Sequence, residues 1–381
     1  MKFLFIVQGE GRGHMTQAIA LAELLQKQGH EISAVAIGKS ERRKIPDFVF
    51  EKIKAPIYLF ESPNFITDKE GKSILLGKTI GYNLGRLPIF KKSLDQLHAL
   101  FKQHKPDILI NFYDILGGLY KFLYRPEAEL WVIGHQYLIA HPDFPFAKSI
   151  GLEKLLFQAN TKITSLGATM HLALSFRPLP PSKDPKLRIL PPLLRPQLRE
   201  LKPSPGDFIL TYMVNPGYGE EVKAFAEKNP TLKIEAFWDN KAHPDTFQVL
   251  PNVVFHPVND QLFLEKMAAC RGLVSTAGFE SIAEAMYLGK PVMAVPVQGQ
   301  YEQACNALDA QISGAGIQKE KFDYTAFINY LNRHGDQHHP TTDWAESFNR
   351  LFLPLLDQMT KSKHQVTKEK PRFALPKLSL R

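Results

Sequence analysis

The protein has 381 residues, of which 44% are hydrophobic and 22% are charged, as is ordinary for a folded globular protein. This length exceeds that of one compact domain, so we expect two domains. The two cysteines, Cys270 and Cys305, exclude a disulfide framework and a cysteine-based metal cluster, and they favour a reducing compartment. No stretch has the features of a secretion signal or of a membrane span, so we expect a cytoplasmic protein.

The formal net charge of +9 is distributed unevenly along the sequence. Residues 1–200 hold 28 Lys and Arg against 18 Asp and Glu, residues 201–360 hold 12 against 19, and residues 361–381 hold 7 against 1. A basic surface suits nucleic acid, anionic lipid or a phosphorylated small molecule, or it is simply solvated. Because no nucleic-acid-binding motif occurs, we expect no nucleic-acid partner and favour a lipid or a phosphate.

The first part of the sequence predicts alternating strands and helices. An apolar strand at residues 2–7 is followed by a glycine-rich loop, a helix that ends at Gly29, and a second strand at residues 31–38. Further apolar runs predict strands at residues 107–112 and 130–134. A strand, a loop, a helix and another strand in this order form the repeating unit of a doubly wound sheet.

A proline-rich stretch interrupts this alternation, which then starts again. Nine prolines lie between Arg177 and Pro205, too many for a helix or a central strand, so we expect a linker there. Strands are then predicted at residues 208–214, 232–238, 253–258, 272–275 and 291–295, and helices at residues 219–228, 260–269, 281–288 and 301–311. We therefore predict an α/β fold with two doubly wound, Rossmann-like domains.

The domain boundaries follow from these two blocks. We expect residues 1–198 to form the first domain, completed by a C-terminal helix at residues 343–360, and residues 203–335 to form the second. Residues 361–381 are basic, contain two prolines and show no hydrophobic period, so we expect a disordered tail.

The first candidate motif is the loop between the first strand and the first helix, with Gly9, Gly11, Gly13 and His14. Glycines at a helix start let backbone amides approach an anion. The dinucleotide-binding fingerprint requires a glycine where His14 stands, and the phosphate-binding Walker pattern is absent. A histidine at this position is placed either to accept a proton from a bound hydroxyl or to cap the loop.

The second motif runs from Ser275 to Glu284. Gly278 permits a diphosphate to approach the start of a helix, and the carboxylate of Glu284 is placed to accept hydrogen bonds from both hydroxyls of a ribose. The alternative is purely structural, because Ser281 and Glu284 have the spacing of a capping box.

The third motif includes Gln300, Glu302 and Gln303, which follow the predicted strand at residues 291–295. Two side-chain amides and an acid at the carboxyl end of a strand offer hydrogen bonds to sugar hydroxyls. The same residues are also ordinary at the start of a surface helix.

Taken together, the three motifs resemble the GT-B glycosyltransferases of the family twenty-eight type, which includes the lipid-intermediate N-acetylglucosaminyltransferase of peptidoglycan synthesis and diacylglycerol glycosyltransferases. The resemblance covers most of the chain and implies two domains facing a central cleft. It also implies a donor site, with Glu284 on the ribose, Ser275, Gly278 and Ser281 near the diphosphate, Gln300, Glu302 and Gln303 facing the sugar, and Phe255 and His256 at the nucleotide base. Gly217 lies in a loop that departs from the glycine-rich loop of these enzymes.

The resemblance implies an inverting hexosyltransferase. Such an enzyme moves a sugar from a nucleotide-diphosphate sugar, here a UDP-sugar, to a hydroxyl of a lipid-linked, phosphorylated or cell-envelope acceptor. The loop with Gly9, Gly11 and Gly13 would face the acceptor, and the base candidates are His14 first and Asp114 second. No Asp-x-Asp motif occurs, so we expect no essential metal and no cofactor besides the nucleotide sugar.

Three questions stay open at this point. The same donor site suits a nucleotide-sugar 2-epimerase, or a catalytically inactive subunit that binds a nucleotide sugar. Residues 55–105 mix apolar side chains with lysines and arginines, which indicates either a helical core with a solvated face or a surface that docks on the inner face of the cell membrane.

Overall fold

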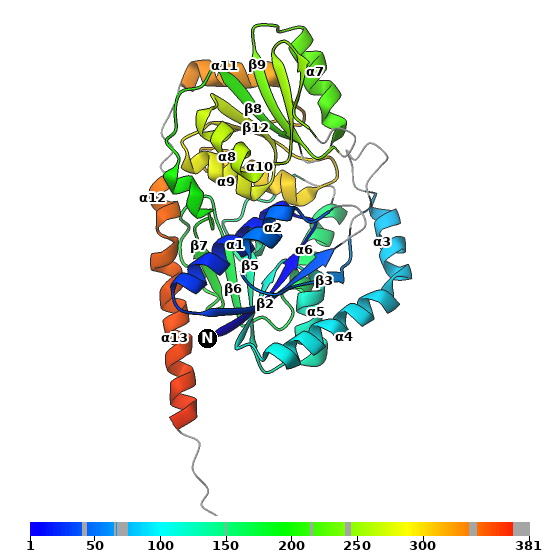
Figure 1. Ribbon diagram of the computed structural model, residues 1–381, viewed down its shortest axis with the longest axis vertical. Helices are drawn as coiled ribbons and strands as arrows, with labels where there is room; N and C mark the ends of the chain where they lie inside the picture. Colours follow the sequence, from blue (N-terminus) through cyan, green and yellow to red (C-terminus); the bar gives the residue numbers. More distant parts are fainter. Residues whose placement is uncertain are drawn as a thin grey trace, which may run out of the picture.

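A computed structural model describes residues 1–39, 44–64, 66, 75–148, 151–213, 216–240, 245–334 and 341–368. These residues form two α/β units that meet along one side, with a long C-terminal helix beside the first unit (Figure 1). Each unit is built on a seven-stranded sheet, and the two sheets are separate. The prediction of two doubly wound, Rossmann-like domains is confirmed.

The first sheet has the strand order β3-β2-β1-β4-β5-β6-β7, and all its pairs are parallel. Its strands are β1 (Lys2–Gln8), β2 (Glu31–Lys39), β3 (Ile57–Glu61), β4 (Ile108–Phe112), β5 (Glu129–Gly134), β6 (Met170–Leu174) and β7 (Leu187–Leu190). The helices of this unit are α1 (Arg12–Lys27), α2 (Asp47–Lys52), α3 (Leu76–Gly85), α4 (Leu87–His104), α5 (Ile115–Tyr124), η1 (His135–Ala140) and α6 (Leu152–Thr164). The central strands are buried along most of their length, because helices cover both faces.

The second sheet has the order β10-β11-β9-β8-β12-β13-β14. Its strands are β8 (Phe208–Met213), β9 (Lys233–Trp238), β10 (Phe247–Leu250), β11 (Val253–Pro257), β12 (Gly272–Thr276), β13 (Val292–Val295) and β14 (Gly316–Gln318). The helices are η3 (Pro216–Tyr218), α7 (Gly219–Glu227), α8 (Asp260–Ala269), α9 (Phe279–Tyr287), α10 (Tyr301–Ile312) and α11 (Tyr324–His334). The edge strand β10 pairs antiparallel with β11, and its residues had not been predicted as a strand.

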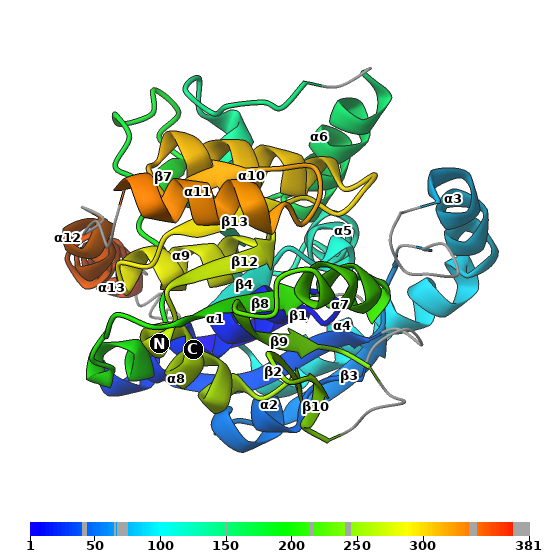
Figure 2. The same cartoon turned by 90° about the horizontal axis from the view of Figure 1, so that it is seen from above.

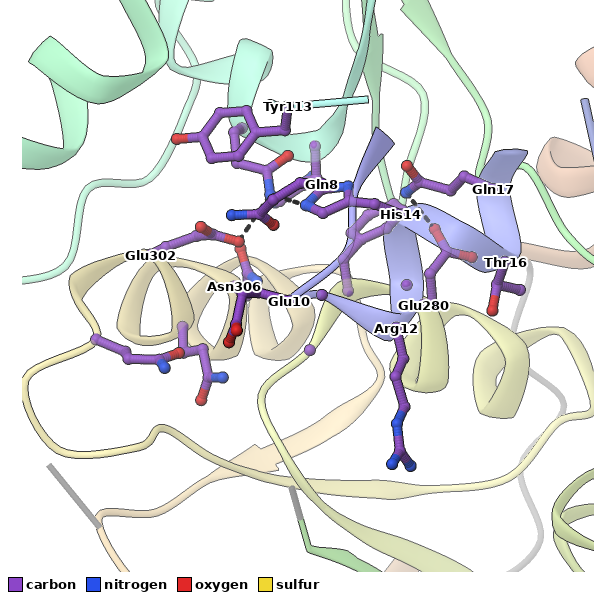
Figure 3. Close-up of a pocket in the computed structure, with 18 of the residues that line it drawn as sticks. Gln8, Glu10, Arg12, His14, Thr16, Gln17, Tyr113, Glu280, Glu302 and Asn306 are labelled. Carbon is purple, nitrogen blue, oxygen red and sulfur yellow. Dashed lines mark hydrogen bonds between the residues drawn. The ribbon is translucent and has the colours of Figure 1, made fainter. Parts of the chain in front are cut away.

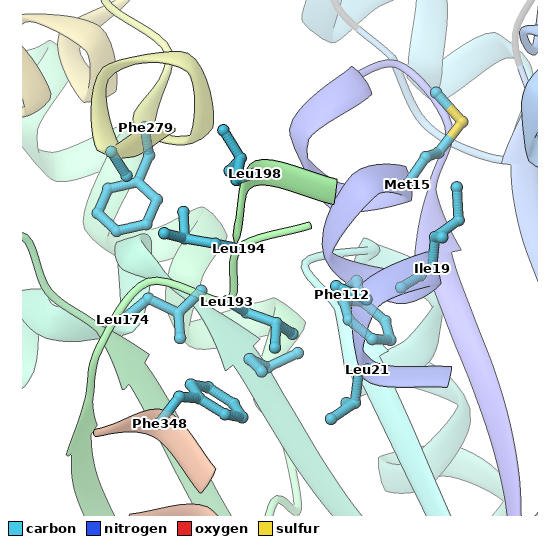
Figure 4. Close-up of a cluster of buried hydrophobic side chains, with 14 of the residues drawn as sticks. Met15, Ile19, Leu21, Phe112, Leu174, Leu193, Leu194, Leu198, Phe279 and Phe348 are labelled. Atoms are coloured by element: carbon cyan, nitrogen blue, oxygen red, sulfur yellow. The ribbon is translucent and has the colours of Figure 1, made fainter. Parts of the chain in front are cut away.

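The proline-rich stretch is a packed connection between the two sheets. It contains the edge strand β7, where prolines on either side are tolerated, and the 3₁₀ helix η2 (Pro196–Glu200). Leu193, Leu194 and Leu198 are buried in a hydrophobic cluster that also contains Phe279 of the second unit (Figure 4). The connection thus belongs to a core that is continuous between the two units, which restricts their relative motion.

The C-terminal helices α12 (Thr341–Glu346) and α13 (Phe348–Lys368) return to the first unit. The ring of Phe352, which is fully buried, meets Trp131 of β5 edge to face, with 6.4 Å between ring centroids. The helix continues to Lys368, eight residues beyond the predicted end, because no proline or glycine interrupts residues 361–368. The rest of the predicted tail, residues 369–381, lies outside the described residues.

Candidate active site

The topology of the two sheets determines where a ligand would bind. In the first sheet the strand order reverses between β1 and β4, and in the second between β8 and β12. Ligands of doubly wound sheets bind beyond the carboxyl ends of the strands at such points. The loops that follow β1, β4 and β12 line a single cavity of about 610 Å³ between the two units.

The glycines of the loop after β1 have two different roles. The Gly9 amide donates to the carbonyl oxygen of Gly38 at 2.9 Å, and a Cβ on Gly9 would lie 2.3 Å from that oxygen. Gly9 is therefore required for the packing of β1 against β2 and lies outside the cavity. Gly11 and Gly13 do line it, at the start of α1.

His14 lies in the first turn of α1 and faces the cavity (Figure 3). Its imidazole ring stacks on the ring of Tyr113, with 5.7 Å between ring centroids, and His14 is 9% exposed. Burial lowers the pKa of His14 to about 4, and the neighbouring Gln17 side chain opposes this shift. The imidazole is therefore neutral near pH 7, the state in which it accepts a proton.

Gln136 connects His14 to the opposite wall of the cavity. Its side-chain amide donates to Oε1 of Glu302 at 2.8 Å and lies 3.4 Å from Nε2 of His14. Burial raises the pKa of Glu302 to about 7. A chain of polar side chains thus crosses the cavity from α1 to α10.

Asp114 caps a helix behind the wall of the cavity. Its Oδ1 accepts a hydrogen bond from the Leu116 amide at 2.8 Å and caps α5, while Oδ2 accepts one from Ser62 at 2.8 Å. The side chain is fully buried and lies outside the cavity. An acid directly after a buried strand acts here as a helix cap, and the assignment of Asp114 as the second base candidate stays a prediction that this position does not favour.

The start of α9 forms part of the cavity wall on the side of the second unit. Gly278, the N-cap residue, has an extended backbone (φ −78°, ψ 137°), and a Cβ there would lie 3.8 Å from its nearest neighbour among the described residues. The fold itself therefore has room for a side chain at Gly278. Ser281 lines the cavity too, whereas Ser275 is fully buried behind it, with the two hydroxyl oxygens 3.1 Å apart.

Glu284 lies one turn further along α9 and is 2% exposed. Its two carboxylate oxygens accept hydrogen bonds from Nε and Nη2 of Arg195, at 2.6 and 2.7 Å. Arg195 comes from the connection between the two sheets. The pair leaves about two of the four acceptor positions of the carboxylate for other donors, and Glu284 lines the cavity.

The third motif also borders the cavity. Gln300, Glu302 and Gln303 all line it. Oε1 of Gln303 accepts a hydrogen bond from the Val297 amide at 2.8 Å, which holds the loop before α10. The side-chain oxygen of Gln303 is therefore hydrogen-bonded within the loop, and its side-chain nitrogen is the group that can bind a ligand.

Three predicted contacts lie elsewhere. Phe255 packs in the core of the second sheet, and His256 lies within hydrogen-bond distance of Glu235 and stacks on Phe237. Neither lines the cavity, because side chains within a strand point to the two faces of the sheet. Val258 and Asn259, which follow β11, line the cavity instead. Gly217 lies in η3, also outside the cavity.

A model of the family described as glycosyl transferase family 1 matches residues 1–334 of the sequence. The protein belongs to this family. No curated protein matches the chain in sequence. The protein is thus an enzyme, a glycosyltransferase with a nucleotide-sugar donor, and its narrower resemblance to the family twenty-eight enzymes stays a prediction.

Solved glycosyltransferases share the fold of this chain. The SsfS6 enzyme of Streptomyces sp. SF2575, in complex with thymidine diphosphate, is 15% identical, with a TM-score of 0.58 and coverage of 94% of this chain and 99% of that one. UGT2 of Phytolacca americana, complexed with UDP-2fluoro-glucose and pterostilbene, is 12% identical, with a TM-score of 0.61 and coverage of 94% and 99%. SnogD of Streptomyces nogalater is 16% identical, with a TM-score of 0.57 and coverage of 92% and 96%. These likenesses confirm the GT-B fold.

Several side chains of this glycosyltransferase that line the cavity were not singled out from the sequence. They are Arg12, Gln17, Tyr113, Gln136, Arg195 and Glu280. Tyr113 has a positive φ of 62°, a strained conformation for a bulky residue, and such strain clusters at functional sites. Gln136 and Tyr113 each lie just beyond a strand of the first sheet, so their place in the chain was a usable signal.

The structure contains no apparent metal centre or membrane span within its described ranges. No three His, Cys, Asp or Glu side chains gather there as metal ligands. No helix of that part of the glycosyltransferase is both long and apolar enough to cross a membrane. The expectation that catalysis needs no metal stays a prediction.

The buried neutral state of His14 predicts a pH-dependent stability. In the unfolded chain a histidine has a pKa near 6.5, so between pH 6.5 and 4 the unfolded chain binds a proton that the folded one excludes. The free energy of unfolding therefore decreases as the pH is lowered through this window. We predict that His14→Gln removes roughly 3 kcal/mol of this pH dependence, measured by urea unfolding from pH 7.5 to 4.5. His334→Gln, at an exposed histidine, is the control; equal slopes for both variants would contradict the prediction.

Proposed function

We propose that this glycosyltransferase transfers a sugar from a UDP-sugar to a hydroxyl of a lipid-linked, phosphorylated or cell-envelope acceptor, with inversion at the anomeric carbon. The observation that carries the proposal is the neutral, buried imidazole of His14, which faces the Gln136 and Glu302 pair across the cavity. A base on one wall and sugar-binding groups on the other suit a direct displacement.

The donor would occupy the second-unit side of the cavity. Glu284, held in orientation by Arg195, would accept hydrogen bonds from the ribose hydroxyls. The diphosphate would lie at the start of α9, where backbone amides and the helix dipole attract anions and Gly278 leaves space. The sugar would then reach Gln300, Glu302 and the amide of Gln303.

In the reaction, Nε2 of His14 would remove the proton of the acceptor hydroxyl while its oxygen attacks the anomeric carbon. The bond from that carbon to the diphosphate oxygen breaks, and the leaving diphosphate keeps the electron pair. The start of α9 would stabilise this charge without a metal ion. Because one displacement takes place, the product has the opposite anomeric configuration.

Substitution at Gly278 tests the donor site. A methyl group has room within the fold but projects into the space where the diphosphate would lie. We predict that Gly278→Ala keeps the thermal stability of the wild type and weakens UDP binding by about tenfold or more in calorimetry. Gly81→Ala, in α3 with nothing nearby, is the matched control and should bind UDP normally. Unchanged UDP binding by Gly278→Ala would place the diphosphate elsewhere.

Substitution at His14 tests the base. We predict that His14→Ala lowers turnover by about 10²–10⁴-fold and leaves UDP affinity nearly unchanged, because the residue acts on the acceptor. The assay is the transfer of radiolabelled sugar from UDP-glucose or UDP-N-acetylglucosamine to a membrane lipid extract, with the anomer of the product assigned by NMR. Asp114→Asn, which keeps the helix cap, should retain turnover. A retained anomer, or full turnover by His14→Ala, would disprove the mechanism.

The exposed surface near the acceptor side supports a lipid-anchored acceptor. Ile80 and Leu84 of α3 are 51% and 60% exposed, and Leu87 and Ile89 at the start of α4 are exposed as well. The same part of the chain holds the exposed Lys78, Lys91 and Lys92, and Arg86, which is paired with Glu61. Both overall views place α3 at the periphery of the first unit (Figures 1 and 2). Because Ile80 also lines the cavity, this surface and the cavity are continuous.

This surface predicts binding to anionic membranes. We expect the protein to float with vesicles of phosphatidylglycerol and phosphatidylcholine, and the double variant Ile80→Glu with Leu84→Glu to stay in the soluble fraction. Ile312→Glu, at an equally exposed apolar residue of the second unit, should float like the wild type. Equal flotation of all three proteins, or none by the wild type, would argue against a membrane-bound acceptor.

A further inference from the structure

We propose that Glu280 acts as an uncharged carboxylic acid that donates a hydrogen bond to the diphosphate of the donor and to the leaving group during transfer. This inference rests on the proposed function, because it concerns the same donor site. It adds a residue that the sequence motifs did not indicate.

Glu280 lines the cavity where the two units meet. Glu280 is the second residue of α9, two positions after Gly278, and it is 7% exposed. Its Oε1 accepts a hydrogen bond from the side-chain amide of Gln17 at 2.5 Å, across the boundary between the two units (Figure 3). Its Oε2 is buried and has no hydrogen-bond partner in the described part of the chain. The oxygen without a partner thus belongs to a residue that lines the cavity at the start of α9.

The surroundings of Glu280 favour its protonated form. Burial raises its pKa most, and the negative charge of Glu284 one turn away raises it further. The hydrogen bond from Gln17 and the positive charge of Arg195 oppose this, and the resulting pKa is about 8. Of the other groups at this end of α1, His14 is uncharged near pH 7, and Arg12 is paired with Asp239 at 2.9 Å.

The protonated form explains why an acid is compatible with this position. An ionised carboxylate at the start of α9 would repel a diphosphate. A protonated carboxylic acid has no charge to repel it and can donate a hydrogen bond to it. Gln17 donates to Oε1, so Oε1 acts as the carbonyl oxygen and Oε2 carries the proton. The proton remains on Glu280, and the hydrogen bond strengthens as negative charge develops on the leaving oxygen.

A bound diphosphate would raise the pKa of Glu280 further, so binding takes up a proton whenever part of Glu280 is ionised. At pH 8 we expect the wild type to take up about half a proton per UDP. This number is measured by calorimetry in two buffers of different ionisation enthalpy. Between pH 7 and 8.5 the wild-type Kd should weaken by about fourfold.

Glu280→Gln is the decisive variant, since it keeps a donor and removes the titration. It should bind UDP without the additional proton uptake and with a Kd that is constant from pH 7 to 8.5. Asp114→Asn is the matched control, because Asp114 is also a buried acid with a pKa raised to about 6, but lies outside the cavity. It should behave like the wild type.

The outcomes separate the two proposals. If folded wild-type protein binds no UDP at all, the proposed donor site and this inference both fail. If UDP binds with the same proton uptake and pH dependence in wild type and Glu280→Gln, the donor site stands and the role of Glu280 is disproved. Should Glu280→Gln fail to fold, a pH-independent wild-type Kd would still overturn the inference.

Discussion

The buried ion pair between Arg195 and Glu284 is the interaction on which the arrangement of the cleft depends. Both side chains are almost inaccessible, and the guanidinium donates to both carboxylate oxygens, at 2.6 and 2.7 Å. Removing one partner of such a pair commonly costs about 3–5 kcal/mol, because the other charge stays buried alone. Arg195 belongs to the connection between the sheets and Glu284 to the donor-side helix. The pair therefore fixes the position of that helix relative to the first unit.

The second constraint is the burial of titratable side chains around the cleft. Burial displaces the pKa of His14 downward and the pKa values of Glu280 and Glu302 upward, so each favours its uncharged form. Two helix starts, those of α1 at Gly11 and α9 at Gly278, border the same space. Positive helix ends attract an anion, and uncharged side chains beside them suit the roles of base and hydrogen-bond donor that we propose.

The sequence predicted the fold well because its signals are local. Alternating apolar runs, Gly29 after the first helix and the restart after the prolines each depend on neighbouring residues, and the alternation determines the sheet class. The short edge strands β10 and β14 were not predicted, because four or three residues are too few to show a recognisable hydrophobic pattern. The cleft was predicted in part: Gly278 and Glu302 line it, but His256 does not. Whether a buried strand residue faces a ligand or the core depends on its register, which composition does not reveal.

Residues that depend on distant partners were not predictable. Arg195 pairs with Glu284 across 89 residues, Gln136 with Glu302 across 166, and Gln17 with Glu280 across 263. No local spacing contains these pairs. They exist because the carboxyl ends of the two sheets are brought face to face, and so they are properties of the tertiary structure.

The most direct test of the central claim, that the cleft between the units is the nucleotide-sugar site, is hydrogen–deuterium exchange of the whole chain with and without UDP. The account predicts slower exchange of backbone amides at residues 278–281 and 299–303, with a smaller effect at residues 11–14. Unchanged exchange in these segments would contradict it. So would protection confined to a separate pocket, which Leu198, Pro203 and Tyr287 line.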